Sequence, residues 1–146
     1  MVTLSDQLKS DFEELFHENE DYPEYNDIIV KKQYEKYPEI HYPMLTIQEL
    51  NNENVNRYFN DEGEQVVYVG YQFRIDSEQT STHTALENVE IIGSIIDDYM
   101  SGDKYYCLRR IGNFAKYPMQ NDNNVITGYL RYEGHIEKNT NTIYRR

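Results

Sequence analysis

The chain has 146 residues, a net charge of −12 and one cysteine, Cys107. This length suits a single domain with a sizeable core, and one cysteine excludes an intramolecular disulfide. Lysine and arginine are few and scattered, which disfavours nucleic-acid binding through a basic surface. No apolar run is long enough to cross a bilayer and no signal-peptide pattern occurs, so we expect an intracellular protein that does not contact membranes.

Residues 3–16, TLSDQLKSDFEELF, predict a first helix. Its apolar side chains recur at steps of three and four residues and form one stripe: Leu4, Leu8, Phe12, Leu15 and Phe16. Thr3 can cap this helix, and Pro23 prevents its continuation.

Two Tyr-Pro pairs, Tyr37-Pro38 and Tyr42-Pro43, precede the alternating segment PMLTIQEL. Proline pushes the preceding residue toward extended conformations, so these pairs hold the approach to the next element extended. We therefore expect a strand over residues 43–50, with Pro43 at a tolerated first position. The β-branched run IIV, residues 28–30, predicts a short strand before it.

The Asn-rich segment NNENVNRYFNDEG, residues 51–63, is interpreted as a long connection. Connections of this length are usually functional or disordered, so we expect it to be mobile in the free chain and ordered against a partner. The alternating segment that follows, EQVVYVGYQFRID, predicts the strongest strand. One face holds Val67, Val69, Tyr71, Phe73 and Ile75, the other holds Gln72 and Arg74, and Gly70 suggests a bulge.

The strongest predicted helix covers residues 82–101. An apolar stripe that contains Val89, Ile92, Ile96 and Met100 is expected to pack across a sheet. Thr84 and Glu87 form a capping-box pattern, and Gly102 supplies the stop.

Residues 104–118 predict a further strand, bent near Gly112. Residues 125–137 predict the last long strand, with Ile126, Leu130, Tyr132 and Ile136 on one face. A polar tail of about residues 138–146 follows. The expected fold is a single α+β domain, residues 1–146, in which two helices pack on a mainly antiparallel β-sheet in the order α-β-β-β-α-β-β.

No catalytic or cofactor-binding motif occurs in the chain. The four histidines lack metal-ligand spacing, and most carboxylates fall in runs typical of solvated loops. Cys107 lies in a strand pattern and is interpreted as a core residue. We therefore predict no catalytic residue, no metal ligand, no cofactor and no enzymatic activity, and an acid-catalysed hydrolase ranks last among the functions considered.

In element order, the segments KYPEIHYPMLTIQEL, VVYVGYQFRID, TALENVEIIGSIIDDYM and NVITGYLRYEGHIEKNTNTIYRR resemble tail terminator (tail completion) proteins of long-tailed bacteriophages, of the siphophage or myophage type. The resemblance covers about residues 1–146. It implies an α+β subunit of a hexameric ring that caps the tail tube, stops its polymerisation and joins it to the head or neck. The implied partners are further copies of the chain, the tail tube protein and a head-completion or neck protein. The implied location is the virion tail, after synthesis in the bacterial cytoplasm.

DNA would pass through the lumen of such a ring without specific binding. An acidic chain suits that passage, because each contact of a lysine or arginine with a phosphate adds affinity for DNA. The 15 tyrosines are of a type enriched at protein interfaces. Since copies of a −12 chain repel one another, association is expected to rest on tyrosine-rich edges and loops and to survive rising salt. The candidate interface residues are Asn54, Arg57, Tyr58, Phe59, Tyr144, Arg145 and Arg146.

Two alternative functions stay open. One is another head–tail connector, such as a head-closure or neck protein. The other is an acidic DNA mimic or inhibitor that docks on a basic partner. A mass measurement separates the terminator from the mimic, because a terminator forms a ring and a mimic is a monomer or dimer.

Overall fold

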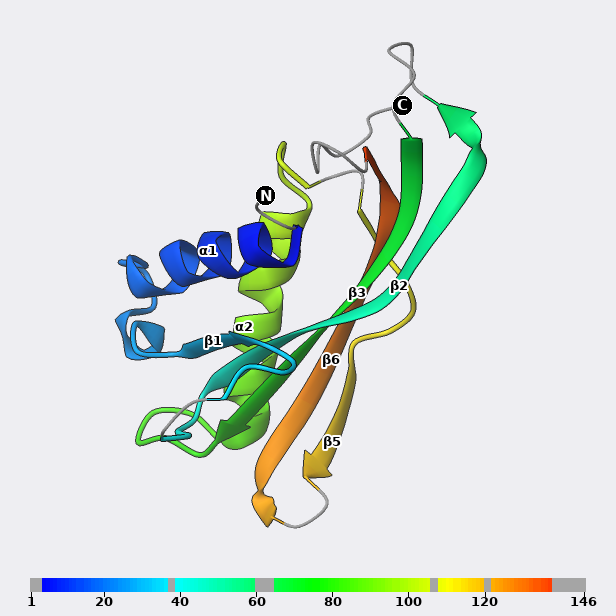
Figure 1. Ribbon diagram of the computed structural model, residues 1–146. Helices are drawn as coiled ribbons and strands as arrows, with labels where there is room; N and C mark the ends of the chain where they lie inside the picture. The colour runs from blue at the N-terminus through cyan, green and yellow to red at the C-terminus, as the bar shows by residue number, and fades with distance from the viewer. Residues whose placement is uncertain (1–3, 37–38, 60–64, 106–107, 120–121, 138–146) are drawn as a thin grey trace.

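The computed structural model describes residues 4–36, 39–59, 65–105, 108–119 and 122–137. Two α-helices, one short 3-10 helix and six strands follow one another along the chain (Figure 1). They are α1 (Leu4–His17), η1 (Pro23–Tyr25), β1 (Ile29–Lys32), β2 (Met44–Phe59), β3 (Gln65–Glu78), α2 (Ala85–Met100), β4 (Arg109–Arg110), β5 (Ala115–Met119) and β6 (Asp122–Glu137). The predicted α+β class and element order are confirmed.

The six strands form one sheet in the order β1-β2-β3-β6-β4, and β5 also pairs with β6. Only β1 and β2 pair in parallel, and every other pair is antiparallel. Strand β3 is central, since it pairs with β2 on one side and with β6 on the other along its length. One edge of the sheet is therefore formed by β1, and the opposite edge by β4 and β5.

Both helices lie on one side of the sheet (Figure 1). Phe12 of α1 joins the layers, because its ring lies 5.0 Å from that of Phe73 on β3 and 6.1 Å from that of Tyr99 on α2. The stripe of α1 is buried at Leu4, Leu8, Phe12 and Phe16, whereas Leu15 is only partly buried. Thr3, the expected cap, lies outside the described residues.

Helix α2 follows the predicted pattern closely. Val89, Ile92, Ile96 and Met100 are all buried against the sheet. The backbone N–H of Glu87 donates to Thr84 Oγ1, and the Glu87 side chain accepts from the N–H of Thr84, so the capping box is present. This reciprocal pair satisfies two donors that a helix start leaves without partners.

Phe114 fills a gap between α2 and β6 that two glycines leave. A Cβ atom built on Gly93 would lie 2.3 Å from Phe114 Cε2, and one built on Gly128 would lie 2.6 Å from Phe114 Cε1. No side chain fits at such distances without displacing the ring. The two glycines therefore let Phe114 pack between the helix and the sheet.

The segment predicted as a connection is largely a strand, and that prediction is wrong over residues 51–59. Strand β2 continues through Phe59, and Asn51–Asn54 pair with residues Val67–Gly70 of β3. Asparagine disfavours strands, but pairing with a strong neighbouring strand overrides that weak preference. The suggested bulge is present in β2 opposite Gly70, where Leu50 is the extra residue. Residues 60–63 lie outside the described residues.

The single bent strand predicted over residues 104–118 is two short strands instead. Both β4 and β5 pair with β6, and Gly112 between them has a φ of 74°. Glycine adopts this left-handed conformation without the penalty that a side chain brings, so the chain leaves the ladder there. Cys107 lies outside the described residues. So do Tyr37 and Pro38, whereas Pro43 immediately precedes β2 in a cis peptide bond with Tyr42.

Candidate interaction surfaces

Two tyrosine–carboxylate–cation clusters fix the helices, and the first joins α1 to the chain that follows α2. Tyr105 donates a hydrogen bond to Asp11, whose Oδ2 lies 2.7 Å from Lys104 Nζ. Tyr105 is fully buried. Burial and the bond to Asp11 raise the pKa of the Tyr105 phenol, so it stays a proton donor.

The second cluster joins α2 to β6 and β4. Tyr132 donates to Asp97 Oδ1 at 2.6 Å, and Arg110 Nη1 lies 3.2 Å from Asp97 Oδ2. Burial, together with Asp97, raises the pKa of Tyr132. A phenol held neutral in this way orients its carboxylate and does not act as a general base. Both clusters are therefore structural.

The helix-free face of the sheet carries hydrogen-bonded polar side chains. Gln72 Nε2 donates to Gln48 Oε1 at 2.7 Å across β3 and β2. Asp76 is fully buried, accepts from Thr127 Oγ1 at 2.5 Å and lies 3.1 Å from Arg74 Nε. Removing Arg74 would leave the charge of Asp76 buried and uncompensated, which is destabilising. The predicted placement of Gln72 and Arg74 on this face is confirmed.

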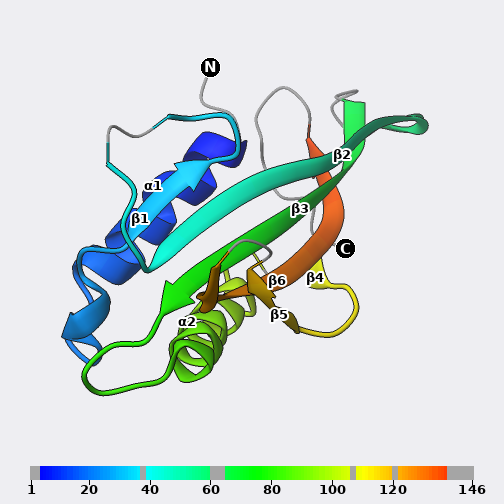
Figure 2. The ribbon, with the colours of Figure 1, turned by 90° about the horizontal axis from the view of Figure 1, so that it is seen from below.

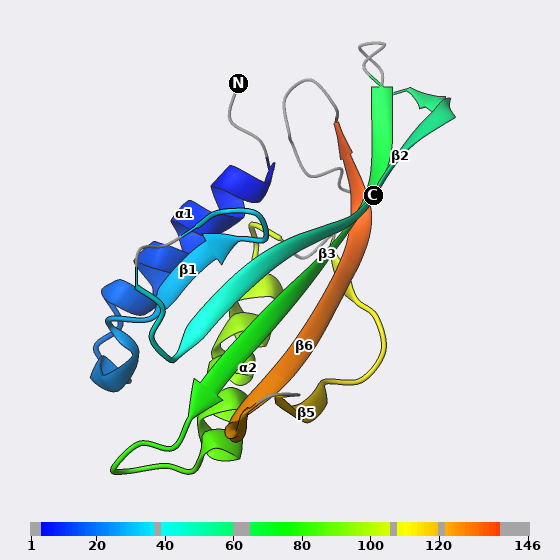
Figure 3. The same ribbon diagram turned by 60° about the horizontal axis from the view of Figure 1, so that its bottom comes forward.

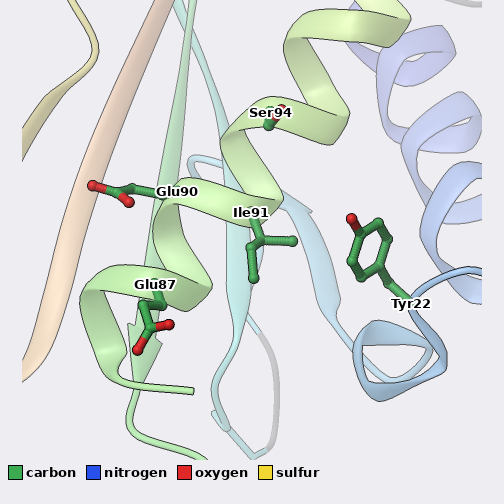
Figure 4. Close-up of a pocket in the computed structure, with 5 residues that line it drawn as sticks. All are labelled: Tyr22, Glu87, Glu90, Ile91 and Ser94. Carbon is green, nitrogen blue, oxygen red and sulfur yellow. The ribbon is translucent and has the colours of Figure 1, made fainter. Parts of the chain in front are cut away.

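A pocket of about 290 Å³ lies between α2 and the turn before η1. Tyr22 faces Ile91 across it, and Glu87, Glu90 and Ser94 complete its lining (Figure 4). Glu87 caps the helix, and this role lowers the pKa of its carboxyl. The lining holds no nucleophile paired with a base, so it suits contact with a side chain better than catalysis.

A second pocket, of about 420 Å³, lies where β1 ends beside β2. Two of its charged lining residues, Lys32 and Glu35, are engaged in ion pairs, and a third, Glu49, accepts a hydrogen bond from the Ser5 hydroxyl. Lys32 Nζ lies 2.5 Å from Asp6 Oδ1, and Glu35 Oε2 lies 2.8 Å from Lys9 Nζ. Those contacts join α1 to the end of β1. Across the described ranges, no group of three or more His, Cys, Asp and Glu side chains could hold a metal ion.

Exposed carboxylates are concentrated at one end of the helix layer. Residues 10–30 contain eight carboxylates and neither lysine nor arginine. We call residues 14–27 the acidic end, since they expose six of these side chains: Glu14, Glu18, Glu20, Asp21, Glu24 and Asp27. The aromatic Tyr22 is 38% exposed within this segment. The acidic end thus combines strong negative charge with an accessible aromatic ring.

The opposite edge of the sheet has a different composition. Residues 104–121 contain four lysines and arginines and no carboxylate. We call residues 109–119, which include β4 and β5, the basic edge. Arg110 and Lys116 reach Asp97 and Glu90 of α2, at 3.2 and 3.3 Å. Arg109 is exposed and forms no ion pair with any described carboxylate within 4.0 Å.

Strands β2 and β3 run past the helices and project from the rest of the molecule (Figure 3). Strand β1 pairs only with Met44–Ile47, so beyond Ile47 the outer edge of β2 pairs with no other described strand. We call β2 from Gln48 to Phe59, with the part of β3 paired to it, the strand extension. Four candidate interface residues, Asn54, Arg57, Tyr58 and Phe59, belong to its backbone, and nothing is described of their side chains.

The other three candidates, Tyr144, Arg145 and Arg146, lie outside the described residues, so the two groups are not brought together. Sequence reasoning missed the acidic end and the basic edge as surfaces. The signal was present, because the cation-free run and the carboxylate-free run can be read from the sequence. No protein-family model matches the chain, and no curated protein matches it either. None of the helices in the described ranges is long and apolar enough to cross a membrane.

Proposed function

We propose that this chain is a tail terminator subunit of a long-tailed bacteriophage. Six copies form a ring that caps the tail tube, stops its polymerisation and offers a joining surface to the head or neck. The observation that carries the proposal is the strand extension, which leaves the helix-covered part of the sheet with its outer edge open (Figure 3).

An open strand edge favours a role in assembly. Its backbone N–H and C=O groups form a template for another strand, and proteins that stay monomeric usually shorten, charge or cover such an edge. Here the edge runs from Gln48 to Phe59, far longer than the four residues of β1. In the proposed ring, the extension reaches the tube end or the adjoining neck protein, and β-strand addition is one mode that such an edge permits.

We call the two helices, with the part of the sheet that they cover, the body. Its side chains support a binding role over a catalytic one. Its buried tyrosines Tyr105 and Tyr132 are protonated donors to carboxylates, and Lys32 and Glu35 of the larger pocket are engaged in ion pairs. The net charge of −12 keeps the ring from holding DNA as it passes, because few cations are present to neutralise phosphates.

Deletion of the gene from a phage tests the proposal. We expect tails of uncontrolled, greater length and free heads, with normal tails restored by the wild-type gene supplied in trans. Tails of normal length that fail to join heads would instead favour the head-closure alternative. A purified chain that stays monomeric, together with normal virions after deletion, would overturn the assignment and favour the inhibitor alternative.

A further inference from the structure

We infer that neighbouring subunits contact one another through oppositely charged surfaces, the acidic end of one copy against the basic edge of the next. This inference rests on the proposed function, since it names the contact that builds the ring. It draws on two surfaces that flank α2, one against Asn88 and Ile91 and the other against Glu90 and Asp97.

The first step is geometric. The acidic end precedes β1, which forms one edge of the sheet, whereas β4 and β5 form the other. In Figures 1 and 2 helix α2 lies between β5 and the end of α1 with the turn after it. When two different surfaces of a subunit bind each other in neighbouring copies, the copies associate head to tail. Such contacts generate a ring when the repeated rotation from copy to copy returns to the first copy.

The second step concerns charge. The acidic end exposes six carboxylates between residues 14 and 27, with no lysine or arginine among them. The basic edge holds Arg109, Arg110 and Lys116. The two carboxylates of α2 that face it, Glu90 and Asp97, leave it one cation in excess. A modest excess matters here, because most other surfaces of a −12 chain would repel the acidic end.

The third step is the pocket between α2 and the turn before η1. It has a volume of about 290 Å³ and adjoins the acidic end through Tyr22, with Glu87 and Glu90 on its wall (Figure 4). The basic edge exposes two large apolar side chains, Ile111 at 43% and Tyr117 at 57%. An aromatic or aliphatic anchor in a pocket, with polar residues at the rim, is a common arrangement in stable interfaces.

This arrangement revises the expectation drawn from net charge alone. A contact between unlike charges weakens as salt rises, because exposed charges are screened over about 8 Å at physiological ionic strength. We therefore expect rings of the purified chain to dissociate at high salt, whereas association by tyrosine-rich edges alone would survive it.

Reciprocal charge reversal tests the inference. One variant carries Arg109→Glu on the basic edge, and a second carries Glu20→Lys with Asp21→Lys on the acidic end. Each alone should weaken self-association at least about tenfold, since like charges meet at the contact. Mixed in equal amounts, the two variants should form rings again, because each altered surface then meets a complementary one.

The control reverses two exposed carboxylates elsewhere, Glu39→Lys with Asp98→Lys, and changes the net charge by the same amount as the Glu20→Lys, Asp21→Lys variant. We expect this variant to form rings like the wild type. Mass is measured by sedimentation after brief chemical cross-linking, and circular dichroism checks that each variant is folded. If a variant does not fold, the salt dependence of the wild-type ring tests the same inference.

Rings that form normally in both variants, or that persist unchanged at high salt, would overturn the inference and leave the proposed function standing. Variants that fail alone but are not restored by mixing would also overturn it. A wild-type chain that never associates, and whose deletion leaves tails of normal length, would remove both the inference and the function on which it rests.

Discussion

The helix-covered part of the sheet and the strand extension are built from the same two strands, yet they differ in what stabilises them. At Phe73 and Ile75 of β3, the side chains that face the helices are fully buried. Beyond Gln48, β2 has lost its β1 neighbour, and the extension projects past both helices (Figure 3). Burial of apolar area on both β2 and β3 stabilises the first region, whereas the buried apolar side chains described in the extension, Val69 and Tyr71, both belong to β3.

This difference separates folding from assembly along a single pair of strands. The buried core of the described residues is formed within one chain. The extension keeps an open edge, so any partner strand can bind there without competing for core contacts. Four experiments test whether the two regions differ in this way.

Alkaline pH should unfold the body. Burial raises the pKa of Tyr25 and of Tyr71 to about 12, so the folded chain holds protons that the unfolded chain loses above about pH 10. Their stabilising contribution is complete below pH 10 and is lost as the pH rises toward 12. Thermal unfolding across that interval, with tyrosinate absorbance, checks this. Full ionisation near pH 10 in a chain that stays folded would contradict it.

Truncation under α2 should destabilise the body strongly. Ile92→Ala and Ile96→Ala each remove a fully buried side chain and are expected to cost about 2–5 kcal/mol in the free energy of unfolding. Leu86→Ala on the same helix is the control, since Leu86 is 43% exposed and should change little. Urea unfolding measures all three. Equal effects at Leu86 and Ile92 would show that the α2 stripe is not the packed face.

The effect of Gly93→Ala on the free energy of unfolding should change sign when the Phe114 ring is removed. In the wild-type chain Gly93→Ala forces a Cβ against the Phe114 ring, and overpacking costs about 1–3 kcal/mol. In a Phe114→Ala background the ring is absent, and Gly93→Ala should stabilise the helix by up to about 1 kcal/mol. A double-mutant cycle measures the coupling, and additive effects would rule out the contact.

The smallest effect on stability is expected in the strand extension, where local opening is the useful measurement. Backbone amides of Asn51–Asn54 should exchange hydrogen faster than those of Met44–Ile47, which lie between β1 and β3. In assembled rings or tails the same amides should exchange more slowly. Equal protection of the two segments in the free chain, or no change on assembly, would contradict a partner-binding role for the extension.

Most of the body could be predicted from local pattern. The three-to-four spacing and capping box of α2, and the alternation of β3, are strong because burial on one face dictates the residue type at each position. The Asn-rich part of β2 could not be predicted, since its structure comes from pairing with β3 and not from its own preference. Gly112 breaks the strand predicted around it through a backbone conformation that composition alone does not reveal.

The candidate surfaces were harder to predict than the fold. Residues 14–27 and 109–119 can be recognised as charged segments in the sequence, but only the strand order shows that they lie toward opposite edges of the sheet. Residues 51–59, which hold four of the candidate interface residues, were predicted as a connection and belong to strand β2. A surface depends on which distant segments the topology brings together or separates, and no local pattern contains that information.

Strand β3 also determines how the molecule bears mechanical load. Its ladder with β6 runs from Val66 to Glu78, so the tip of the extension and the strand beneath α2 belong to one continuous element. A force applied along that element loads many hydrogen bonds at once in shear, whereas a force across the sheet would break them one after another. Tension or compression along the strand axis is therefore transmitted directly to the core at Phe73, where helix and sheet meet.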